Sequence, residues 1–272
     1  MMRPIYQRDL AVLRAALDLL ARDDRAIGEN LDRLYEMLLA RRLSSIAEEL
    51  LPVLAEKVTH GPFAGMVYSS ETVEGCTIPK LLGCYEQELH PVLDRMKNRG
   101  FDKILNIGCA EGYYAIGLAH MFPGAEIHAW DIDPIAQEKV LRNAMVNGVS
   151  ERVSVEGAFD PEEFDRFVGH STLVVCDIEG AEFECVDPVR SPALAKFDLI
   201  VELHPDENCT AEEFADRFLL THDTELLQPK SREVGPFEVL NHLAPLDQSL
   251  ALFERLESTP WCVCWAQGRE QH

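Results

Sequence analysis

Basic side chains are scarce in this sequence. Its 272 residues include 25 Lys and Arg against 47 Asp and Glu, which gives a net charge of −22. Proteins that bind nucleic acid or anionic membranes draw much of their affinity from Lys and Arg side chains beside phosphate groups. The composition therefore argues against both kinds of partner, and the acidic surplus mainly favours solubility.

Closely spaced cysteine pairs and long apolar runs are missing as well. None of the eight cysteines forms a CxxC pair, and the first residues carry no apolar signal region. No apolar run approaches the roughly 18 residues that a membrane span needs. We therefore expect reduced cysteines in a soluble, cytoplasmic protein that folds without disulfides.

Residues 1–58 are predicted to form a helical arm. Leucine and isoleucine recur at three- and four-residue spacing in three groups, Leu10–Leu20, Ile27–Leu38 and Leu43–Leu54. This pattern predicts three amphipathic helices. Ser45 and Glu48 suit a capping box for the third helix, and Pro52 is expected to kink or end it. We expect the arm either to cover the main domain or to form a homodimer contact.

Residues 59–100 are predicted to be a loop followed by a helix from about Leu81 to Arg99, and we expect this segment to cover the ligand site. From residue 101 onward, strand patterns alternate with helix patterns. The predicted strands are Lys103–Ile107, Glu126–Trp130, Arg152–Val155, Thr172–Cys176, Phe197–Leu203, Glu225–Gln228 and Trp261–Ala266. The predicted helices between them are Tyr113–Met121, Pro134–Asn147, Pro161–Val168, Ala181–Val186 and Ala211–Leu220, with Gln248–Leu256 in an insertion at 231–260.

The first five predicted strands are short and apolar, as the buried strands of parallel sheets are. Alternation of such strands with helices predicts an α/β fold with a doubly wound, mostly parallel, seven-stranded sheet of the Rossmann-like kind. We assign residues 101–272 to this domain.

A glycine-bearing loop follows the first predicted strand, in the segment Asn106-Ile107-Gly108-Cys109-Ala110-Glu111-Gly112-Tyr113. Such a loop lets a ligand approach the backbone and presents amides to negative charge. Dinucleotides favour G-x-G-x-x-G, but Tyr113 stands at the third glycine. S-adenosylmethionine enzymes use a looser G-x-G-x-G, often with alanine in the middle, and Gly108, Ala110 and Gly112 fit that pattern.

Asp131 lies about twenty residues further on, at the end of the second predicted strand. A carboxylate there can accept hydrogen bonds from both ribose hydroxyls, which both ligand classes carry. Asp131 could instead cap the next helix, but Asp133 suits that role better because it directly precedes Pro134.

Four segments resemble one enzyme family. Asp177-Ile178-Glu179-Gly180-Ala181-Glu182 resembles the D-x-E-G-A-E signature of FkbM-type methyltransferases, and Val201-Glu202-Leu203-His204-Pro205 is similar to the end of their fifth strand. Gly61–Met66 and Pro79–Leu89 resemble segments that precede the catalytic domain in a related bacterial subgroup. The resemblance spans residues 60–205 and leaves out the arm and the region after about residue 220.

The resemblance implies a class I methyltransferase fold, S-adenosylmethionine as cofactor, and O-methylation of a sugar or secondary metabolite. Matching the family residue by residue gives a set of expected cofactor-binding positions, in which Ala158 and Phe159 lie where the adenine is usually read. The set is Asn106, Gly108, Cys109, Ala110, Gly112, Tyr113, Asp131, Ile132, Ala158, Phe159 and Asp177.

The catalytic residues are sought at the carboxyl ends of the fourth and fifth strands, beside the cofactor crevice. Positioning supplies most of the catalysis of methyl transfer, and a hydroxyl acceptor also benefits from a base within hydrogen-bond reach. We predict His204 as that base, with Asp177 and Glu202 as further catalytic residues. Each also has a structural interpretation, as a helix cap, a partner of backbone amides or a loop histidine.

A second mechanism uses the same side chains. Asp177, Glu202 and His204 could hold a divalent ion, Mg²⁺, Mn²⁺ or Zn²⁺, that orients the acceptor and lowers its hydroxyl pKa. We favour the mechanism without metal.

Two other functions compete with a methyltransferase that acts on a small-molecule hydroxyl. One is a nicotinamide-dependent oxidoreductase, against which Tyr113 argues. The other is a non-catalytic protein that keeps the fold, against which the intact loop, Asp131 and the acid–histidine group argue.

Overall fold

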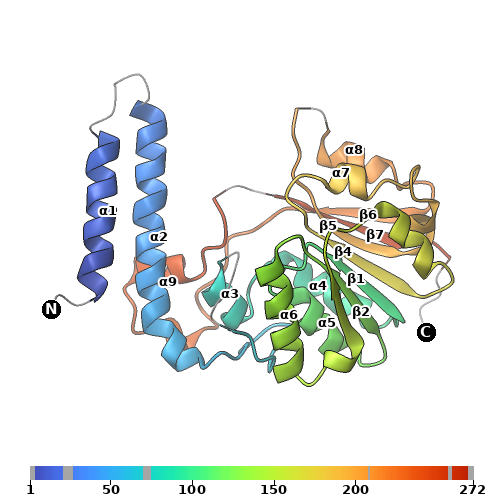
Figure 1. The fold of residues 1–272 in the computed structure, drawn as a ribbon, viewed down its shortest axis with the longest axis horizontal. Coiled ribbons are helices and arrows are strands. Elements are labelled where there is room, and N and C mark those ends of the chain that lie inside the picture. The colour runs from blue at the N-terminus through green and yellow to red at the C-terminus, as the bar shows by residue number, and fades with distance from the viewer. Residues whose placement is uncertain (1–3, 21–26, 70–74, 208, 257–258, 269–272) are drawn as a thin grey trace. The chain divides into compact units, whose positions relative to one another are not determined.

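The computed structural model describes residues 4–20, 27–69, 75–207, 209–256 and 259–268 (Figure 1). The chain divides into two compact units. The first comprises Met1–Ala55 and Val234–Ala251, and the second comprises Glu56–Glu233 and Leu252–His272. Among the described residues, no helix combines the length and the apolar character that crossing a membrane requires. All eight cysteines are reduced, as predicted.

The first unit is built on two long helices, α1 (Pro4–Leu20) and α2 (Ile27–Leu54), with η6 (Glu238–Leu240) and α9 (Pro245–Ala251) from the later segment. The prediction of three helices was wrong, because residues 27–54 form one continuous helix. Ser45 lies inside α2 rather than at a helix start, and its hydroxyl donates to the Arg41 carbonyl one turn earlier. Pro52 is tolerated because the helix ends two residues later.

The first unit also contains a cross-link between segments that lie far apart in the sequence. The Arg42 guanidinium forms two hydrogen bonds with the Asp247 carboxylate, one of them 2.7 Å from Nε to Oδ1. This pair joins α2 to α9, which pack against each other, while α1 packs along α2. The segment predicted as part of an insertion therefore folds with the N-terminal helices.

The second unit contains the sheet. Its strands are β1 (Lys103–Ile107), β2 (Glu126–Trp130), β3 (Val153–Glu156), β4 (Thr172–Cys176), β5 (Asp198–Glu202), β6 (His222–Leu227) and β7 (Trp261–Ala266). They lie in the order β3-β2-β1-β4-β5-β7-β6. The first five are parallel, and β7 runs antiparallel between β5 and β6. The predicted doubly wound, mostly parallel, seven-stranded sheet is confirmed.

The strand order reverses at β1, and this reversal positions the site. Ile107, the last residue of β1, pairs with Trp130 of β2 on one side and Cys176 of β4 on the other. The chain continues from β1 to β2 on one side and from β4 to β5 on the other. The loops after β1 and β4 therefore part, and a crevice opens at the carboxyl ends of these two strands.

Helices cover the sheet where the alternating pattern requires them. They are α5 (Tyr113–Met121), α6 (Pro134–Val146), η3 (Ser150–Arg152), η4 (Pro161–Phe167), α7 (Glu182–Cys185), η5 (Pro192–Lys196) and α8 (Ala211–Asp216). In Figure 1, α5 and α6 pack against β1, β2 and β3, whereas α8 packs against β6 and β7. A buried aromatic cluster between the layers includes Phe164, Phe197, Phe214 and Phe218.

The segment before β1 differs from its prediction. Instead of one helix from Leu81 to Arg99, the chain forms α3 (Thr77–Leu82), η2 (Gln87–Leu89) and α4 (His90–Met96). Gly83 ends α3 with a φ of 76°, and a Cβ there would lie 1.9 Å from the His60 carbonyl oxygen. This close approach leaves room only for glycine, and it turns the chain before the predicted helix can continue.

Candidate active site

The glycine loop after β1 is shaped by two close approaches. Gly108 has a φ of 73°, and a Cβ there would lie 1.6 Å from the Asp177 carbonyl oxygen at the end of β4. Gly112 has a φ of 90°, and a Cβ there would lie 3.2 Å from Val140 of α6. The first glycine thus lets the loop touch the neighbouring strand end, and the second lets α5 begin close to α6.

Asp131 follows β2 and is fixed by backbone amides. Its Oδ2 accepts from the Ala110 amide at 2.8 Å, and its Oδ1 accepts from the Asp133 amide at 2.8 Å. Asp133 caps α6 by accepting from the Ile135 amide, directly before Pro134, as predicted. Asp131 is therefore free of the capping role and is held against the glycine loop.

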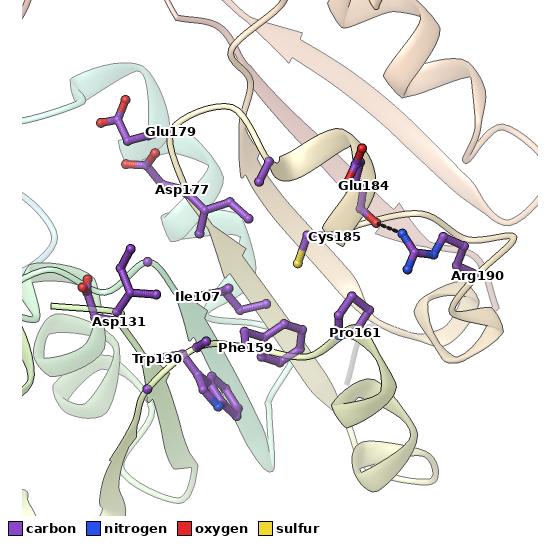
Figure 2. A pocket seen from close by; sticks show the side chains of 16 residues that line it. Ile107, Trp130, Asp131, Phe159, Pro161, Asp177, Glu179, Glu184, Cys185 and Arg190 are labelled. Carbon is purple, nitrogen blue, oxygen red and sulfur yellow. Dashed lines mark hydrogen bonds between the residues drawn. The ribbon is translucent and has the colours of Figure 1, made fainter.

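A cleft of about 540 Å³ opens at the reversal of strand order. Six of the predicted cofactor residues line it: Gly108, Asp131, Ile132, Ala158, Phe159 and Asp177. Figure 2 shows Asp131, Asp177 and Glu179 on one side of this space, and Glu184 and Arg190 on the other. The Phe159 ring lies edge-on to Trp130, with centroids 4.9 Å apart, so an aromatic wall faces the cleft.

Four further predicted residues, Asn106, Cys109, Ala110 and Tyr113, line a separate cavity of about 20 Å³. Gly108 and Asp177 line both spaces, so the two spaces meet at these residues. Gly112 stands at the start of α5 as its N-terminal cap. The predicted cofactor positions thus lie around one continuous edge of the sheet.

A buried ion pair that sequence reasoning missed ties the upstream segment to the glycine loop. Lys80 of α3 is 2% exposed and Glu111 is 1% exposed, and their charged groups lie 2.9 Å apart. The Tyr68 hydroxyl donates to the same Glu111 oxygen. In the sequence, the only sign of this ion pair was the position of Glu111 inside the glycine loop. Nothing near Lys80 in the sequence indicates that the lysine is buried.

An acid–histidine cluster forms beside the cleft. Asp177 follows β4, Glu179 lies in the next turn with a φ of 56°, Glu182 begins α7, and His204 follows β5. One ligand atom each of Asp177, Glu179 and His204 lie within 4.8 Å of one another. His204 Nε2 lies 3.3 Å from Glu179 Oε2, and His204 Nδ1 lies 3.1 Å from Glu182 Oε1.

Burial and neighbouring charges shift the pKa values of this cluster. Burial, reinforced by the Glu179 carboxylate, raises the pKa of Asp177 to about 6. The hydrogen bond with Glu182 raises the pKa of His204 above its usual value, against the effect of burial. Burial acts to raise the pKa of Glu182, but hydrogen bonds from His204 and backbone amides outweigh it and lower that pKa.

The third predicted catalytic residue, Glu202, binds partners outside this acid–histidine cluster. Its carboxylate is 3% exposed, pairs with the Arg255 guanidinium and accepts from the Thr259 hydroxyl. Arg255 also pairs with Glu86, whose carboxylate accepts from the Tyr114 hydroxyl. Burial raises the pKa of Glu86 to about 7. Glu202 and His204 are two residues apart, so in a regular strand their side chains would point to the same side, but β5 ends at Glu202.

Comparison with known proteins places the central part of the chain near methyltransferases. Residues 90–179 match the family model of ribosomal protein L11 methyltransferase (PrmA). An uncharacterized protein of Haemophilus influenzae is 34% identical over 91 residues, which are 30% of this chain and 36% of that protein. The ribosomal protein L11 methyltransferase of Bacillus subtilis is 28% identical over 131 residues, which are 48% of this chain and 37% of that protein. The chain thus spans little more than a third of the length of these relatives.

Among solved structures, the O-methyltransferase TomG of Streptomyces achromogenes, in complex with SAM, is 13% identical with a TM-score of 0.46. The alignment covers 84% of this chain and 90% of that one. A putative O-methyltransferase of Klebsiella pneumoniae is 12% identical with a TM-score of 0.44, over 83% of this chain and 89% of that one. The sheet of this protein has the strand order of the class I methyltransferase fold, and its residues 90–179 are similar in sequence to a methyltransferase family.

Proposed function

We propose that the protein is an S-adenosylmethionine-dependent methyltransferase of the FkbM type that methylates a hydroxyl group of a sugar or another small metabolite. The observation that carries this proposal is the cleft at the reversal of strand order. The glycine loop, Asp131 and Asp177 meet there, as cofactor binding in this fold requires. The FkbM assignment rests on the segments Asp177–Glu182 and Glu202–His204.

The residues of the cleft fit the cofactor. Asp131 is held by two backbone amides, and its remaining lone pairs can accept from the ribose hydroxyls. Phe159 and Trp130 offer an apolar, aromatic wall for the adenine. Asp177 lines the cleft, and its Oδ1 is buried without a hydrogen-bond partner among the described residues. When bound, S-adenosylmethionine supplies a methyl group activated by a sulfonium.

His204 is suited to take the proton of an acceptor hydroxyl. With the Nδ1 proton donated to Glu182, the neutral imidazole leaves Nε2 as the acceptor atom. Glu182 is itself fixed by the amides of Ile178, at 2.9 Å, and Gly180, at 3.1 Å. The buried carboxylate therefore sets the tautomer and stabilises the imidazolium after proton transfer. When the acceptor hydroxyl binds at Nε2, it would displace the exposed carboxylate of Glu179.

The same geometry supports a second mechanism with a divalent cation. Asp177, Glu179 and His204 present one nitrogen and two carboxylate oxygens to one point, and carboxylates with an imidazole suit Mg²⁺ or Mn²⁺. Glu179 takes the place that the sequence suggested for Glu202, whose carboxylate is paired with Arg255.

An oxidoreductase is less compatible with the loop. Tyr113, where a dinucleotide fingerprint has its third glycine, is buried, and its ring packs edge-on against Phe63, Tyr68 and Tyr85. A helix start filled by an aromatic ring does not offer the close packing that this glycine provides.

Isothermal titration tests the proposal. S-adenosylhomocysteine should bind in the micromolar range and NAD should not bind. Asp131→Ala should weaken binding about tenfold or more, since it removes a charge-assisted hydrogen bond. Glu184→Gln is the matched control, because it removes an exposed negative charge from the same cleft. Binding of NAD without any response to S-adenosylhomocysteine would contradict the proposal.

We further propose that residues 1–58 serve a homodimer contact in a cytoplasmic protein. Leu10, Leu13 and Leu17 of α1 share one helix face and are 39%, 57% and 64% exposed. Leu13→Glu should turn a dimer into a monomer by light scattering after gel filtration. Leu220→Glu, at a site 94% exposed in the second unit, should not. A wild-type chain that is already monomeric would contradict this contact.

A further inference from the structure

Two cysteines lie next to each other at the wall of the large cleft. Cys176 ends β4 and is completely buried, whereas Cys185 ends α7, is 8% exposed and lines the cleft of about 540 Å³. Figure 2 shows the Cys185 sulfur pointing into this space. The two side chains belong to one buried cluster, and their thiols form a hydrogen bond with each other. One member of this thiol pair can therefore be reached by a small molecule in the cleft.

The hydrogen bond makes Cys185 the more reactive thiol of the pair. Because Cys185 accepts the hydrogen bond from Cys176, its pKa lies below the usual value, although burial acts against this. The same hydrogen bond, together with burial, raises the pKa of Cys176. The thiolate is the nucleophilic form of cysteine. An oxidant in the cleft should therefore react with Cys185 first, and the thiol of Cys176 is in place to react with the product.

We propose that Cys176 and Cys185 form a redox-responsive pair, which a hydroperoxide converts into a disulfide that alters the wall of the cleft. The Cys185 thiolate attacks hydrogen peroxide and forms a bond to one oxygen, while the other oxygen leaves as hydroxide. The sulfur is thereby oxidised to a sulfenic acid, and the peroxide is reduced. The Cys176 sulfur then attacks the Cys185 sulfur, the S–O bond breaks, and the thiol proton leaves with the hydroxide as water.

The disulfide acts on the site through α7. This helix has only four residues, Glu182–Cys185, and its last two residues line the cleft. Cys176 is fixed inside the sheet, because β4 is paired with β1 on one side and with β5 on the other. Closing the bond therefore draws the end of α7 toward β4. We expect this movement to weaken cofactor binding, a part of the inference that rests on the proposed function.

Peroxide treatment of the full chain tests the pair without any cofactor. After hydrogen peroxide, alkylation of the remaining thiols and digestion at glutamate residues, mass spectrometry should find the peptides of Cys176 and Cys185 linked. Three other cysteines are internal controls. Cys209 is more exposed than Cys185, whereas Cys262 and Cys264 have sulfurs 3.7 Å apart but are completely buried. Exposure alone, or a neighbouring thiol without access to the cleft, should leave these cysteines reduced.

Variants assign the chemistry to the two sulfurs. Cys176→Ala should stop the reaction at the sulfenic acid of Cys185, which dimedone traps, and Cys185→Ala should leave Cys176 reduced. Cys76→Ala is the matched control and should form the disulfide at the wild-type rate, because burial raises the pKa of Cys76 to about 11. A wild-type chain that forms no link between Cys176 and Cys185, or that oxidises Cys209 ahead of Cys185, would overturn the inference.

A titration then measures the effect of the disulfide on the site. S-adenosylhomocysteine should bind the oxidised chain about tenfold more weakly than the reduced chain, and dithiothreitol should restore the affinity. A double variant, Cys176→Ala with Cys185→Ala, should bind equally before and after peroxide. Equal affinities of the oxidised and reduced wild type would overturn the effect on the cleft. No binding to the reduced chain, with the disulfide formed, would contradict the proposed function and not the thiol pair.

Discussion

His204 Nδ1 lies 3.1 Å from Glu182 Oε1, and the Glu182 side chain is completely buried. The two residues come from different strand ends, since Glu182 begins α7 after β4 and His204 follows β5. A buried carboxylate that holds one ring nitrogen determines what the other nitrogen can do. In this protein, Nε2 is the other nitrogen, and it lies 3.3 Å from Glu179 Oε2.

The first prediction concerns the pKa of His204. Because the Glu182 hydrogen bond is the largest contribution that raises this pKa, Glu182→Gln should lower it toward about 6.5. Glu179→Gln should lower it less, since its contribution ranks below that of Glu182. NMR titration of the ring signals measures both. A pKa that is unchanged in Glu182→Gln would show that the pair does not tune the imidazole.

The second prediction concerns turnover. A panel of sugar and phenol hydroxyls first identifies an acceptor for the wild type. His204→Ala should then lower methyl transfer by roughly 10²–10⁴-fold, the usual scale for a general base, with cofactor affinity almost unchanged. His170→Ala, at an exposed histidine, should keep wild-type turnover. The wild-type rate should increase with pH as His204 loses its proton, above its ordinary pKa.

A chelator separates the two mechanisms at this cluster. Turnover that is insensitive to EDTA supports His204 as the base. Loss of turnover with EDTA, restored by Mg²⁺ or Mn²⁺, would make Asp177, Glu179 and His204 ligands instead. Nearly full turnover of His204→Ala, with no effect of metal, would show that the histidine has only a structural role.

The third prediction links the site to stability. The pKa of Asp177 is raised in the folded protein to about 6, so the folded state favours the protonated carboxyl. The stability that this group contributes is present below its unfolded pKa and is lost as the pH rises through about 6. Asp177→Asn should therefore raise the Tm by about 2–4 °C at pH 7.5 and have little effect at pH 4.5. The same variant should lower turnover. Thermal unfolding that shows no pH-dependent difference would contradict this assignment.

The fourth prediction concerns the ion pairs around Arg255. Arg255→Ala leaves the buried carboxylates of Glu86 and Glu202 without their cation, which should cost about 3–5 kcal/mol of unfolding free energy. Arg95→Ala removes an arginine whose pair with Glu225 is exposed, so it should cost less than about 1 kcal/mol. Urea unfolding measures both. Similar losses in the two variants would show that the buried network contributes little.

The sheet could be predicted closely because its strands are short apolar runs bordered by Gly, Pro and Asp. The bounds of β1, β2, β4 and β7 agree with the prediction. Helix boundaries could be predicted less closely. No glycine or proline marks a helix end between Leu38 and Leu43, and hydrophobic periodicity alone does not show where one helix ends and the next begins. Gly83 ends α3 through a contact with His60, which lies 23 residues away in the sequence and which no local pattern reveals.

The site could be predicted only in part, for the same physical reason. Gly108, Asp131 and Asp177 could be predicted from their positions at strand ends. The partners of Glu202 could not be predicted, because Arg255 is brought to β5 by a segment some fifty residues downstream. Lys80 is a further case, since a lysine at the end of a predicted loop gives no sign that its ammonium will be buried against Glu111.

A crystal structure with S-adenosylhomocysteine tests the central claim most directly. The account predicts ribose hydroxyls on the Asp131 carboxylate, adenine against Phe159, and sulfur beside Asp177, next to the cluster that contains His204. Density for the nucleoside outside this cleft, or a ribose that makes no contact with Asp131, would contradict it.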